Sequence, residues 1–480
     1  MTTNLQRVAV VGAGAAGTLT AAHLLLRAAE QGLGLDVHLV DPCPGTGRGT
    51  AYATSAGHHL LNVPAGRMSA FADAPDHFTA WLERRTPGTF APGDHVPRGL
   101  YGAYLDDVLT AAAARPGPAR LSRVRDRVVA ARRVGPGVSL CLDGGGTFRA
   151  DAAVLALGTF PPDQSWVPAA LRPSARYVAD PWTPGALAAL PEEGDLLLVG
   201  TGLTMIDVAL AVHHPGRRVH AVSRHGLLPR AHAASALPAV PPPAVDPAQG
   251  LTRVRRTLLA HVSACRRTHG DWRVGVDSLR PVTATVWQGL TPAERARFLA
   301  TDQRLWDVHR HRAPVTTARA FAEAVIAGRI EVGPGEIADA EVTADAVRVR
   351  LRDGRTLDVA AVVNCTGPQA EIRRVGDPLV ADLLAAGLAD PDDVGLGFRT
   401  TAQGRLRPAT GADPAPLWTL GALRRGSLLE STAIPEIRAQ AQAVAASVTA
   451  VLDAAHRAGT RHDTPRAATA ERPHLAYAER

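Results

Sequence analysis

Residues 7–17, RVAVVGAGAAG, join an apolar run to three glycines, and this stretch decides the fold. The run over 8–11 is typical of a buried parallel strand. In the pattern G-x-G-x-x-G, Gly12 permits a tight turn, Gly14 lets the backbone approach a pyrophosphate, and Gly17 allows a helix to pack closely on the strand. The Ala- and Leu-rich segment that follows predicts a helix whose first N–H groups point at phosphates.

A second apolar run, over 37–40, ends in Asp41. A carboxylate at this distance from the glycines is typical of a residue that binds a ribose hydroxyl. Strand, glycines, helix, strand and acid together predict a dinucleotide site. A tight turn without a ligand is the alternative interpretation.

Residues 194–207, GDLLLVGTGLTMID, repeat the pattern with Gly200 and Gly202 but without the third glycine. The next predicted strand, over 218–222, ends in Ser223 and Arg224 rather than in an acid. An acid would repel a 2′-phosphate, whereas Ser and Arg would bind one, so this half favours NADPH over NADH. The alternative for Arg224 is a solvated side chain in an arginine-rich protein.

Two similar segments, 138–158 and 347–367, each follow one of these turns and end in Gly158 and Gly367. Each contains an alternating strand, a D-G turn and a second strand, which is a strong hairpin pattern, and then an apolar strand. The chain therefore reads as an α/β protein with two related Rossmann-like units.

Composition excludes several classes of protein. The chain has 480 residues, and all 52 of its Lys+Arg residues are arginine. Without lysine there is neither a Schiff base nor a Walker A loop. The four cysteines form no C-x-x-C pair, which argues against a dithiol redox centre and a zinc site, so we expect no metal. The scattered arginines make the net charge of +7 weak support for nucleic-acid binding.

No apolar stretch approaches the roughly 20 residues of a membrane span, and the N-terminus enters the first motif without room for a signal peptide. We therefore expect a cytoplasmic protein that binds neither membrane nor nucleic acid. The sequence does not indicate an oligomeric state.

Several motifs resemble those of FAD/NAD(P)-binding proteins among the two-dinucleotide-binding-domain flavoproteins. They include GRGTAYAT (47–54), HLLNVPAGRMSAF (59–71), WDVHRHR (306–312) and ESTAIPEIRAQA (430–441). LALGTFPP (155–162) and the GTGLT turn also resemble N-hydroxylating flavin monooxygenases. The F-x-G-x-x-x-H fingerprint of Baeyer–Villiger and animal-type flavin monooxygenases is absent, which argues against oxygenation of ketones or xenobiotics.

The resemblance implies that the first unit holds FAD and the second NADPH, with the FAD domain closed by a C-terminal segment that includes Gly421. We expect the FAD domain at 1–160 and 358–455, the NADPH domain at 185–228 and 313–357, a helical insertion at 237–312, and a flexible tail at 456–480. Within the insertion, apolar spacing predicts helices over 251–268 and 291–311.

The insertion gathers Trp272, Trp287, Trp306, Arg310 and Arg312. One interpretation is a cap over the flavin in which Arg310 or Arg312 binds a substrate carboxylate bidentately. The alternative is a small helical subdomain with a Trp core and a solvated Arg/His face.

The loop after the ribose acid carries Asn62, which we expect to reach the isoalloxazine edge. Arg67 and Arg98 are alternative residues for the pocket.

These features lead to the hypothesis of an FAD-dependent, NADPH-consuming monooxygenase in specialised metabolism. Its partners would be O2 and a small-molecule substrate, an amine or amino acid that it N-hydroxylates, with an aspartate-like compound among the candidates. One alternative is an NAD(P)H:acceptor flavin oxidoreductase that inserts no oxygen. Another is a non-catalytic nucleotide-binding flavoprotein.

Overall fold

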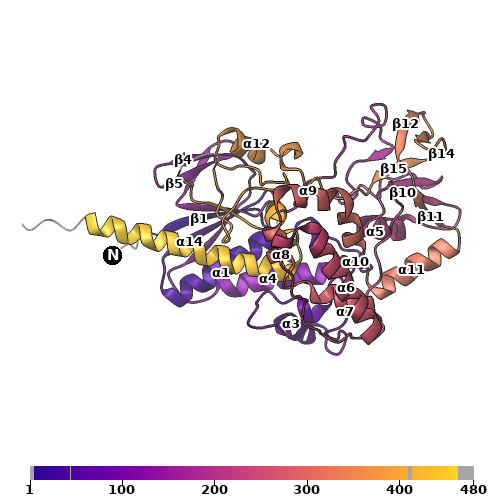
Figure 1. The fold of residues 1–480 in the computed structure, drawn as a ribbon. Coiled ribbons are helices and arrows are strands. Elements are labelled where there is room, and N and C mark those ends of the chain that lie inside the picture. Colours follow the sequence, from indigo (N-terminus) through magenta and orange to yellow (C-terminus); the bar gives the residue numbers. More distant parts are fainter. Residues whose placement is uncertain (1–4, 44, 409–412, 463–480) are drawn as a thin grey trace, which may run out of the picture.

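The computed structural model describes residues 5–43, 45–408 and 413–462. It contains two five-stranded parallel sheets, and each is accompanied by a three-stranded antiparallel sheet. Figure 1 shows the first parallel sheet around β1 and the second around β10, at opposite ends of the molecule. Two α/β units of this kind are what the repeated motifs predict, so the predicted fold class is confirmed.

The first sheet has the strand order β16-β7-β1-β2-β3, with the first motif's strand at its centre. Three helices pack on one face, where α1 is in contact with both α4 and α14. The small antiparallel sheet and α12 cover the other face. The strands are β1 (Gln6–Val11), β2 (Leu35–Val40), β3 (Arg120–Val124), β4 (Val128–Val134), β5 (Gly137–Leu142), β6 (Thr147–Ala150), β7 (Ala152–Leu155) and β16 (Leu417–Thr419), and the helices are α1 (Ala15–Gln31), α2 (Gly49–Tyr52), α3 (His77–Arg85), α4 (Arg98–Ala113), α12 (Pro378–Ala385), α13 (Arg425–Leu428) and α14 (Ile434–His462).

The second sheet has the order β11-β10-β9-β15-β8 and repeats the arrangement of the first. Apolar side chains of α5 and α11 form a core with the apolar residues of its strands. The elements are β8 (Tyr177–Val178), β9 (Leu196–Val199), α5 (Leu203–Val212), β10 (Val219–Ser223), α11 (Val315–Ile326), β11 (Ile330–Pro334), β12 (Ile337–Val342), β13 (Val347–Leu351), β14 (Thr356–Val359) and β15 (Ala361–Asn364).

Three of the expected boundaries differ from the structure. Strand β15 pairs in parallel with β9, with Ala361 opposite Leu196, so the first unit does not resume at residue 358. Tyr177 and Val178 also lie in the second sheet, before the expected start at 185. The tail expected from 456 is helical through His462, because α14 continues to that residue. Residues 463–480 lie outside the described residues.

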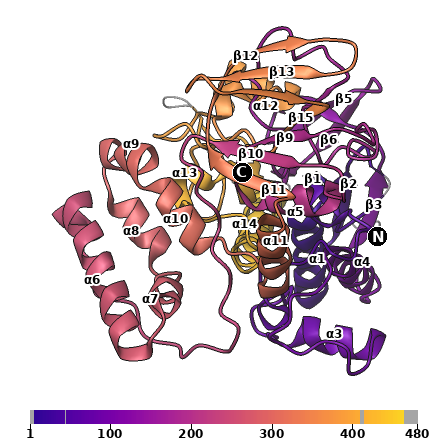
Figure 2. The same cartoon turned by 90° about the vertical axis from the view of Figure 1, so that its right-hand side faces the viewer.

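The insertion lies between β10 and α11. It begins with a largely irregular segment over 224–250, and helices joined by short turns follow. They are α6 (Leu251–His269), α7 (Trp272–Ser278), α8 (Thr283–Gly289), α9 (Pro292–Thr301) and α10 (Gln303–Arg310). Figure 2 shows α6 to α9 as a group beside the two sheets. The helix expected over 291–311 is two helices that meet at Asp302. Trp287 is buried in a small core with Leu251, Val254 and Leu290, as the subdomain interpretation requires.

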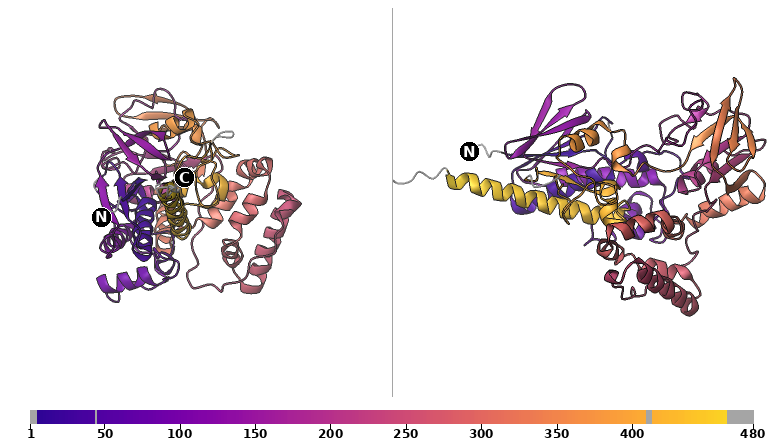
Figure 3. Two further views of the ribbon diagram at one scale, coloured as in Figure 1. Left: turned by 90° about the vertical axis from the view of Figure 1, so that its left-hand side faces the viewer. Right: turned by 45° about the horizontal axis from the view of Figure 1, so that its top comes forward.

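Helix α14 begins beside the insertion and runs past the first sheet. Figure 3 shows its far end projecting away from the rest of the molecule. Near its start, Glu436 receives two hydrogen bonds from Arg280 of the insertion, at 2.7 and 2.6 Å. The insertion is therefore attached to the first unit as well as to the second, from which it branches. None of the described helices is long and apolar enough to cross a membrane.

Candidate functional site

The first glycine turn has a geometry that only glycine can supply. Gly12 has φ of 103°, and a Cβ there would lie 2.3 Å from the Ala156 carbonyl oxygen. A Cβ on Gly17 would lie 1.8 Å from the Gly12 carbonyl oxygen, so the helix packs directly on the turn. Gly14 is the N-cap of α1.

The second turn repeats this geometry. Gly200 has φ of 105°, and a Cβ there would lie 2.3 Å from the Cys365 carbonyl oxygen. Two residues beyond these carbonyls, Gly158 and Gly367 both adopt left-handed conformations, with φ of 70° and 86°. Gly202 is the N-cap of α5, as Gly14 is of α1.

Both turns fit a dinucleotide. Neither α1 nor α5 has a side-chain cap, so the N–H groups of the first helical turn face outward without a side-chain acceptor. A Cβ on Gly202 would meet nothing within 4 Å. Free N–H groups at an uncrowded helix N-terminus suit a pyrophosphate. Contact with a nucleotide at these glycines remains a prediction.

Asp41 lies at the carboxyl end of β2, beside the first turn. One of its carboxylate oxygens accepts from the Ala13 N–H at 2.7 Å, and the other accepts from the Cys43 N–H at 2.7 Å. These bonds fix the carboxylate next to the glycines, while each oxygen keeps a lone pair for a ribose hydroxyl.

Ser223 occupies the matching place in the second unit, but its hydroxyl is already engaged. Thr201 donates to the Leu227 carbonyl at 2.7 Å, so Ser223 must donate its own proton to Thr201 Oγ1, also at 2.7 Å. Ser223 Oγ also accepts from the Gly226 N–H at 3.1 Å. The expectation that Ser223 binds a 2′-phosphate remains a prediction. Arg224 is exposed and has no polar partner in the described part of the chain.

A loop over 45–49 covers the first turn. The Gly47 N–H points at the Ala13 carbonyl at 3.0 Å and at Thr18 Oγ1 at 2.8 Å. The Cα of Gly49 lies 3.5 Å from where a Cβ on Gly14 would be. The sequence analysis assigned no role to this loop, although its alternating glycines, GTGRG, mark a close backbone approach.

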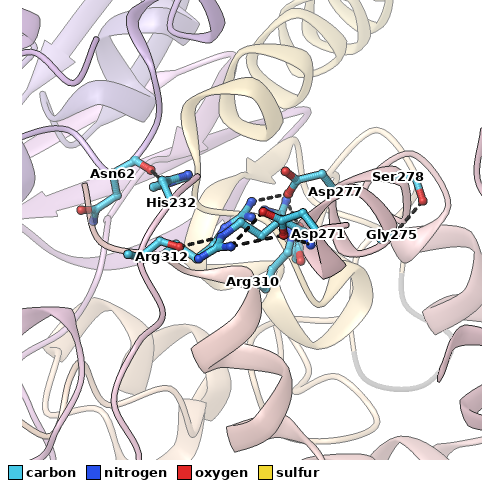
Figure 4. A network of polar contacts seen from close by, with 11 residues as sticks. Asn62, His232, Asp271, Gly275, Asp277, Ser278, Arg310 and Arg312 are labelled. Carbon is cyan, nitrogen blue, oxygen red and sulfur yellow. Dashed lines mark hydrogen bonds and ion pairs between the residues drawn. The ribbon is translucent and has the colours of Figure 1, made fainter. Parts of the chain in front are cut away.

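Asn62 lies where the first unit meets the segment that leads into the insertion. Its backbone carbonyl accepts a hydrogen bond from His232 Nε2 at 2.9 Å, and Figure 4 shows the two residues together. The His232 ring is 4.8 Å from that of His95, which itself bonds the Leu61 carbonyl. Burial and the nearby charge of Arg312 lower the pKa of His232 to about 4. No sequence pattern marks His232, because it is a lone histidine before a proline-rich loop.

Arg310 and Arg312 are both paired with carboxylates. Arg310 donates to Glu430 at 2.8 Å, and the side chains of this pair are 11% and 9% exposed. Arg312, whose side chain is 4% exposed, is paired with Asp277. Figure 4 shows Arg312 with Asp277, and the charge of Arg312 acts on His232. A substrate carboxylate would have to share these arginines with internal acids. Their Nε atoms are buried and lack a partner among the described residues.

Arg98 and Arg67, the alternative residues for the pocket, differ in their burial and their contacts. Arg98 donates to Asp207 of α5 at 2.8 Å and to the Leu60 carbonyl at 2.9 Å, so it joins the first unit to the second. Burial raises the pKa of Asp207, and the charge of Arg98 opposes that rise. Arg67 is exposed.

Gly421 lies at the end of β16, with φ of 74°. Its N–H donates to the Gln440 side chain of α14 at 3.1 Å. Next to it, Thr419 donates to the Leu155 carbonyl at 2.8 Å, which ties β16 to β7. The predicted C-terminal closure of the first unit is thus present. No cluster of His, Cys, Asp and Glu that could hold a metal ion occurs within 5–43, 45–408 and 413–462.

Comparisons with known proteins agree with this geometry. Residues 9–160 match a family described as FAD-NAD(P)-binding. A stretch of 118 residues is 37% identical to an L-aspartate N-monooxygenase (nitrosuccinate-forming) from Streptomyces davaonensis. This match covers 24% of the chain and 18% of that relative's length. Residues 9–160 are therefore similar to an FAD-NAD(P)-binding family, which agrees with the resemblance that the motifs indicate.

Solved structures match nearly the whole chain. A reduced ornithine hydroxylase from Pseudomonas aeruginosa matches with a TM-score of 0.62 and 16% identity, covering 93% of this chain and 100% of that one. An L-lysine 6-monooxygenase from Pseudomonas syringae matches with a TM-score of 0.62 and 19% identity, covering 94% of this chain and 100% of that one. A thioredoxin reductase from Lactococcus lactis matches with a TM-score of 0.51 and 11% identity, covering 94% of this chain and 99% of that one. At these identities the likeness shows the fold alone.

Proposed function

We propose that the protein is an FAD- and NADPH-dependent monooxygenase that hydroxylates the nitrogen of a small amine or amino acid. The main observation in support is that one chain contains two equivalent glycine turns. Gly12 packs against the Ala156 carbonyl in the first turn, and Gly200 packs against the Cys365 carbonyl in the second. Two such turns provide for a flavin nucleotide and a nicotinamide nucleotide. The absence of a C-x-x-C pair argues against the thioredoxin reductase chemistry that the same fold supports.

The first turn would hold FAD. Gly12, Gly14 and Gly17 present the α1 N-terminus to its pyrophosphate, and Asp41 accepts from a ribose hydroxyl. When bound, reduced FAD supplies the activation of O2 for transfer of an oxygen atom. Gly158 and Gly421 end strands β7 and β16 at the same edge of the sheet, where a ligand of an open α/β sheet binds.

The second turn would hold NADPH. Gly200 and Gly202 present the α5 N-terminus to its pyrophosphate, and Gly367 lies at the end of the neighbouring strand. With Ser223 engaged by Thr201, Arg224 is the cation at the end of β10 that is free to reach a 2′-phosphate.

The substrate would bind where Asn62, Arg310 and Arg312 converge, under the insertion. His232 donates from Nε2 to a carbonyl, so Nδ1 carries its lone pair and is an acceptor at neutral pH. Arg310 and Arg312 supply donors for a carboxylate. The insertion, attached to α14 through Arg280, would exclude water from this region.

An aspartate-like amino acid is the first candidate for the substrate. The sequence match to an L-aspartate N-monooxygenase supports this choice. The arginines support it as well, because a dicarboxylate needs two cationic contacts. Four cysteines without a disulfide suit a reducing compartment, so we place the protein in the cytoplasm.

The test is a substrate panel with the purified, FAD-loaded protein. Aspartate, ornithine, lysine and simple amines are each assayed for NADPH oxidation, hydroxylamine-type product and hydrogen peroxide. N-hydroxylation predicts product in proportion to NADPH for at least one amine. NADPH oxidation with an added quinone but no N-oxidised product would identify the acceptor oxidoreductase instead. Failure of NADPH to reduce the flavin would leave the non-catalytic alternative.

A further inference from the structure

Arg304 brings a positive charge from the insertion to the second glycine turn. It lies on α10, and its Nη2 donates to the Leu227 carbonyl at 2.7 Å and to the Thr201 carbonyl at 3.2 Å. The same nitrogen lies 3.3 Å from Thr201 Oγ1. Thr201 stands between Gly200 and Gly202, so the guanidinium group is directly beside the nucleotide turn.

Arg304 has no carboxylate within ion-pair distance in the described part of the chain. Its hydrogen-bond partners are neutral oxygens. Arg310, at the other end of the same helix, is bound to Glu430. Burial lowers the pKa of Arg304, and only the charge of Asp307 acts against this. A half-buried cation without an ion-pair partner is costly unless an anion joins it.

The first unit shows which part of a nucleotide would meet Arg304. There, the residue between the two glycines, Ala13, donates to Asp41, the acid expected on the ribose. In the second unit the matching residues are Thr201 and Ser223, which bond at 2.7 Å. Arg304 contacts Thr201 and is therefore on the ribose side of the turn. The acid of the first unit is replaced there by a neutral serine, and a cation has been added.

We propose that Arg304 binds the 2′-phosphate of NADPH, so that the insertion supplies a residue that selects the cofactor. This inference rests on the proposed function, which assigns the nicotinamide nucleotide to the second turn. Arg304 lies 80 positions beyond Arg224, the cation that directly follows β10.

The contacts of Arg304 suit this role. Nη2 is held by the two carbonyls, while Nη1 and Nε make no hydrogen bond within the described chain and remain donors for phosphate oxygens. A guanidinium group held in place loses less freedom on binding than an exposed arginine such as Arg224. The Ser223 proton is engaged by Thr201, so a 2′-phosphate would depend on arginine donors.

The experiment measures binding of two nucleotide fragments to the FAD-loaded protein by calorimetry. Adenosine 2′,5′-bisphosphate carries the 2′-phosphate, and 5′-AMP lacks it. Wild type should prefer the bisphosphate. Arg304→Gln keeps an amide donor for the Thr201 and Leu227 carbonyls but removes the charge. We expect it to bind the bisphosphate about ten- to a hundredfold more weakly and 5′-AMP unchanged. Arg304→Lys should retain part of the preference.

Arg297→Gln is the matched control, because Arg297 is an exposed arginine of α9 whose Nη2 donates to Thr252 Oγ1. It should leave both affinities unchanged. Retention of the full preference by Arg304→Gln would overturn the inference, and so would an equal loss for both fragments. These failures are separate from failure of the proposed function. A protein that makes no N-oxidised product from any amine, yet loses its bisphosphate preference in Arg304→Gln, would support the inference alone.

Discussion

Arg98 and Asp207 form a buried ion pair between the two units, with 2.8 Å between Nη2 and Oδ2 and side-chain exposures of 12% and 9%. Arg98 begins α4 in the first unit, and Asp207 closes the second glycine motif on α5. The pair thus connects the helix that packs against α1 to the helix that begins at the second turn. The pair is a direct polar contact between the two units.

Replacing Arg98 by Ala should therefore destabilise the protein by about 3–5 kcal/mol, because Asp207 is left as an unpaired buried carboxylate. Urea unfolding at pH 7 measures the loss. Burial raises the pKa of Asp207, and without Arg98 it rises further, so the deficit should shrink as the pH falls and Asp207 becomes protonated. The double variant Arg98→Ala/Asp207→Asn should recover part of the stability at pH 7. A deficit that does not change with pH would contradict this account.

Two glycines of the first turn should respond differently to substitution, because one is needed for nucleotide binding and the other for folding. A Cβ on Gly14 would meet only Gly49, at 3.5 Å, whereas one on Gly12 would clash with a carbonyl. Gly14→Val should fold and lose FAD, since its side chain occupies the approach of the pyrophosphate. Gly12→Ala should lose stability itself. Flavin absorbance and far-UV circular dichroism of the purified variants distinguish the two effects. If Gly14→Val retains its full flavin content, FAD is not bound at this turn.

Arg224 offers a second test of cofactor choice. Because it is exposed, its contact with a 2′-phosphate is screened by solvent, and the effect of Arg224→Ala should be near the lower end for a charged hydrogen bond, about tenfold. The Michaelis constant for NADPH should rise by that factor, and that for NADH should stay nearly constant. Equal changes with both cofactors would remove Arg224 from the 2′-phosphate site.

His232 should make the protein sensitive to acid. Its pKa in the folded state is about 4, below its usual value of 6.5, so the unfolded chain binds the proton first as the pH falls. The folded state is then disfavoured progressively between about pH 6.5 and 4, by up to roughly 3 kcal/mol. His232→Gln keeps a donor for the Asn62 carbonyl and should flatten this loss in urea unfolding. His214→Gln, at an exposed histidine, is the control. Identical acid profiles of His232→Gln and wild type would contradict the assignment.

The features that the sequence predicts are those with local causes. Gly12 and Gly200 stand in strand–turn–helix patterns that occur within a dozen residues, and both turns form as predicted. The run that becomes β15 is apolar and suits either sheet, so its membership depends on pairing with β9 and not on its residues. The bond of Arg310 to Glu430 joins positions 120 residues apart. In a chain rich in arginine, no local pattern indicates which arginines form ion pairs with acidic residues. His232 and Arg304 likewise owe their positions to the docking of the insertion.

The last prediction concerns Arg310, which is both a candidate for substrate binding and part of a buried ion pair. Arg310→Ala would leave Glu430 unpaired, so a loss of activity could come from misfolding. The variant Arg310→Met/Glu430→Gln removes both charges and keeps the volume. If Arg310 binds a substrate carboxylate, this variant should reduce substrate-dependent turnover and leave NADPH oxidation without substrate in place, with hydrogen peroxide as the product.

Arg280→Met/Glu436→Gln is the control, because it removes a different ion pair of the insertion, the one that Arg280 forms with Glu436 of α14. If that control uncouples NADPH oxidation from product as strongly as the Arg310 variant does, the arginines act only by seating the insertion. If both variants keep wild-type coupling, the substrate carboxylate binds elsewhere, and Arg67 becomes the next residue to test, since Arg98 is bound to Asp207.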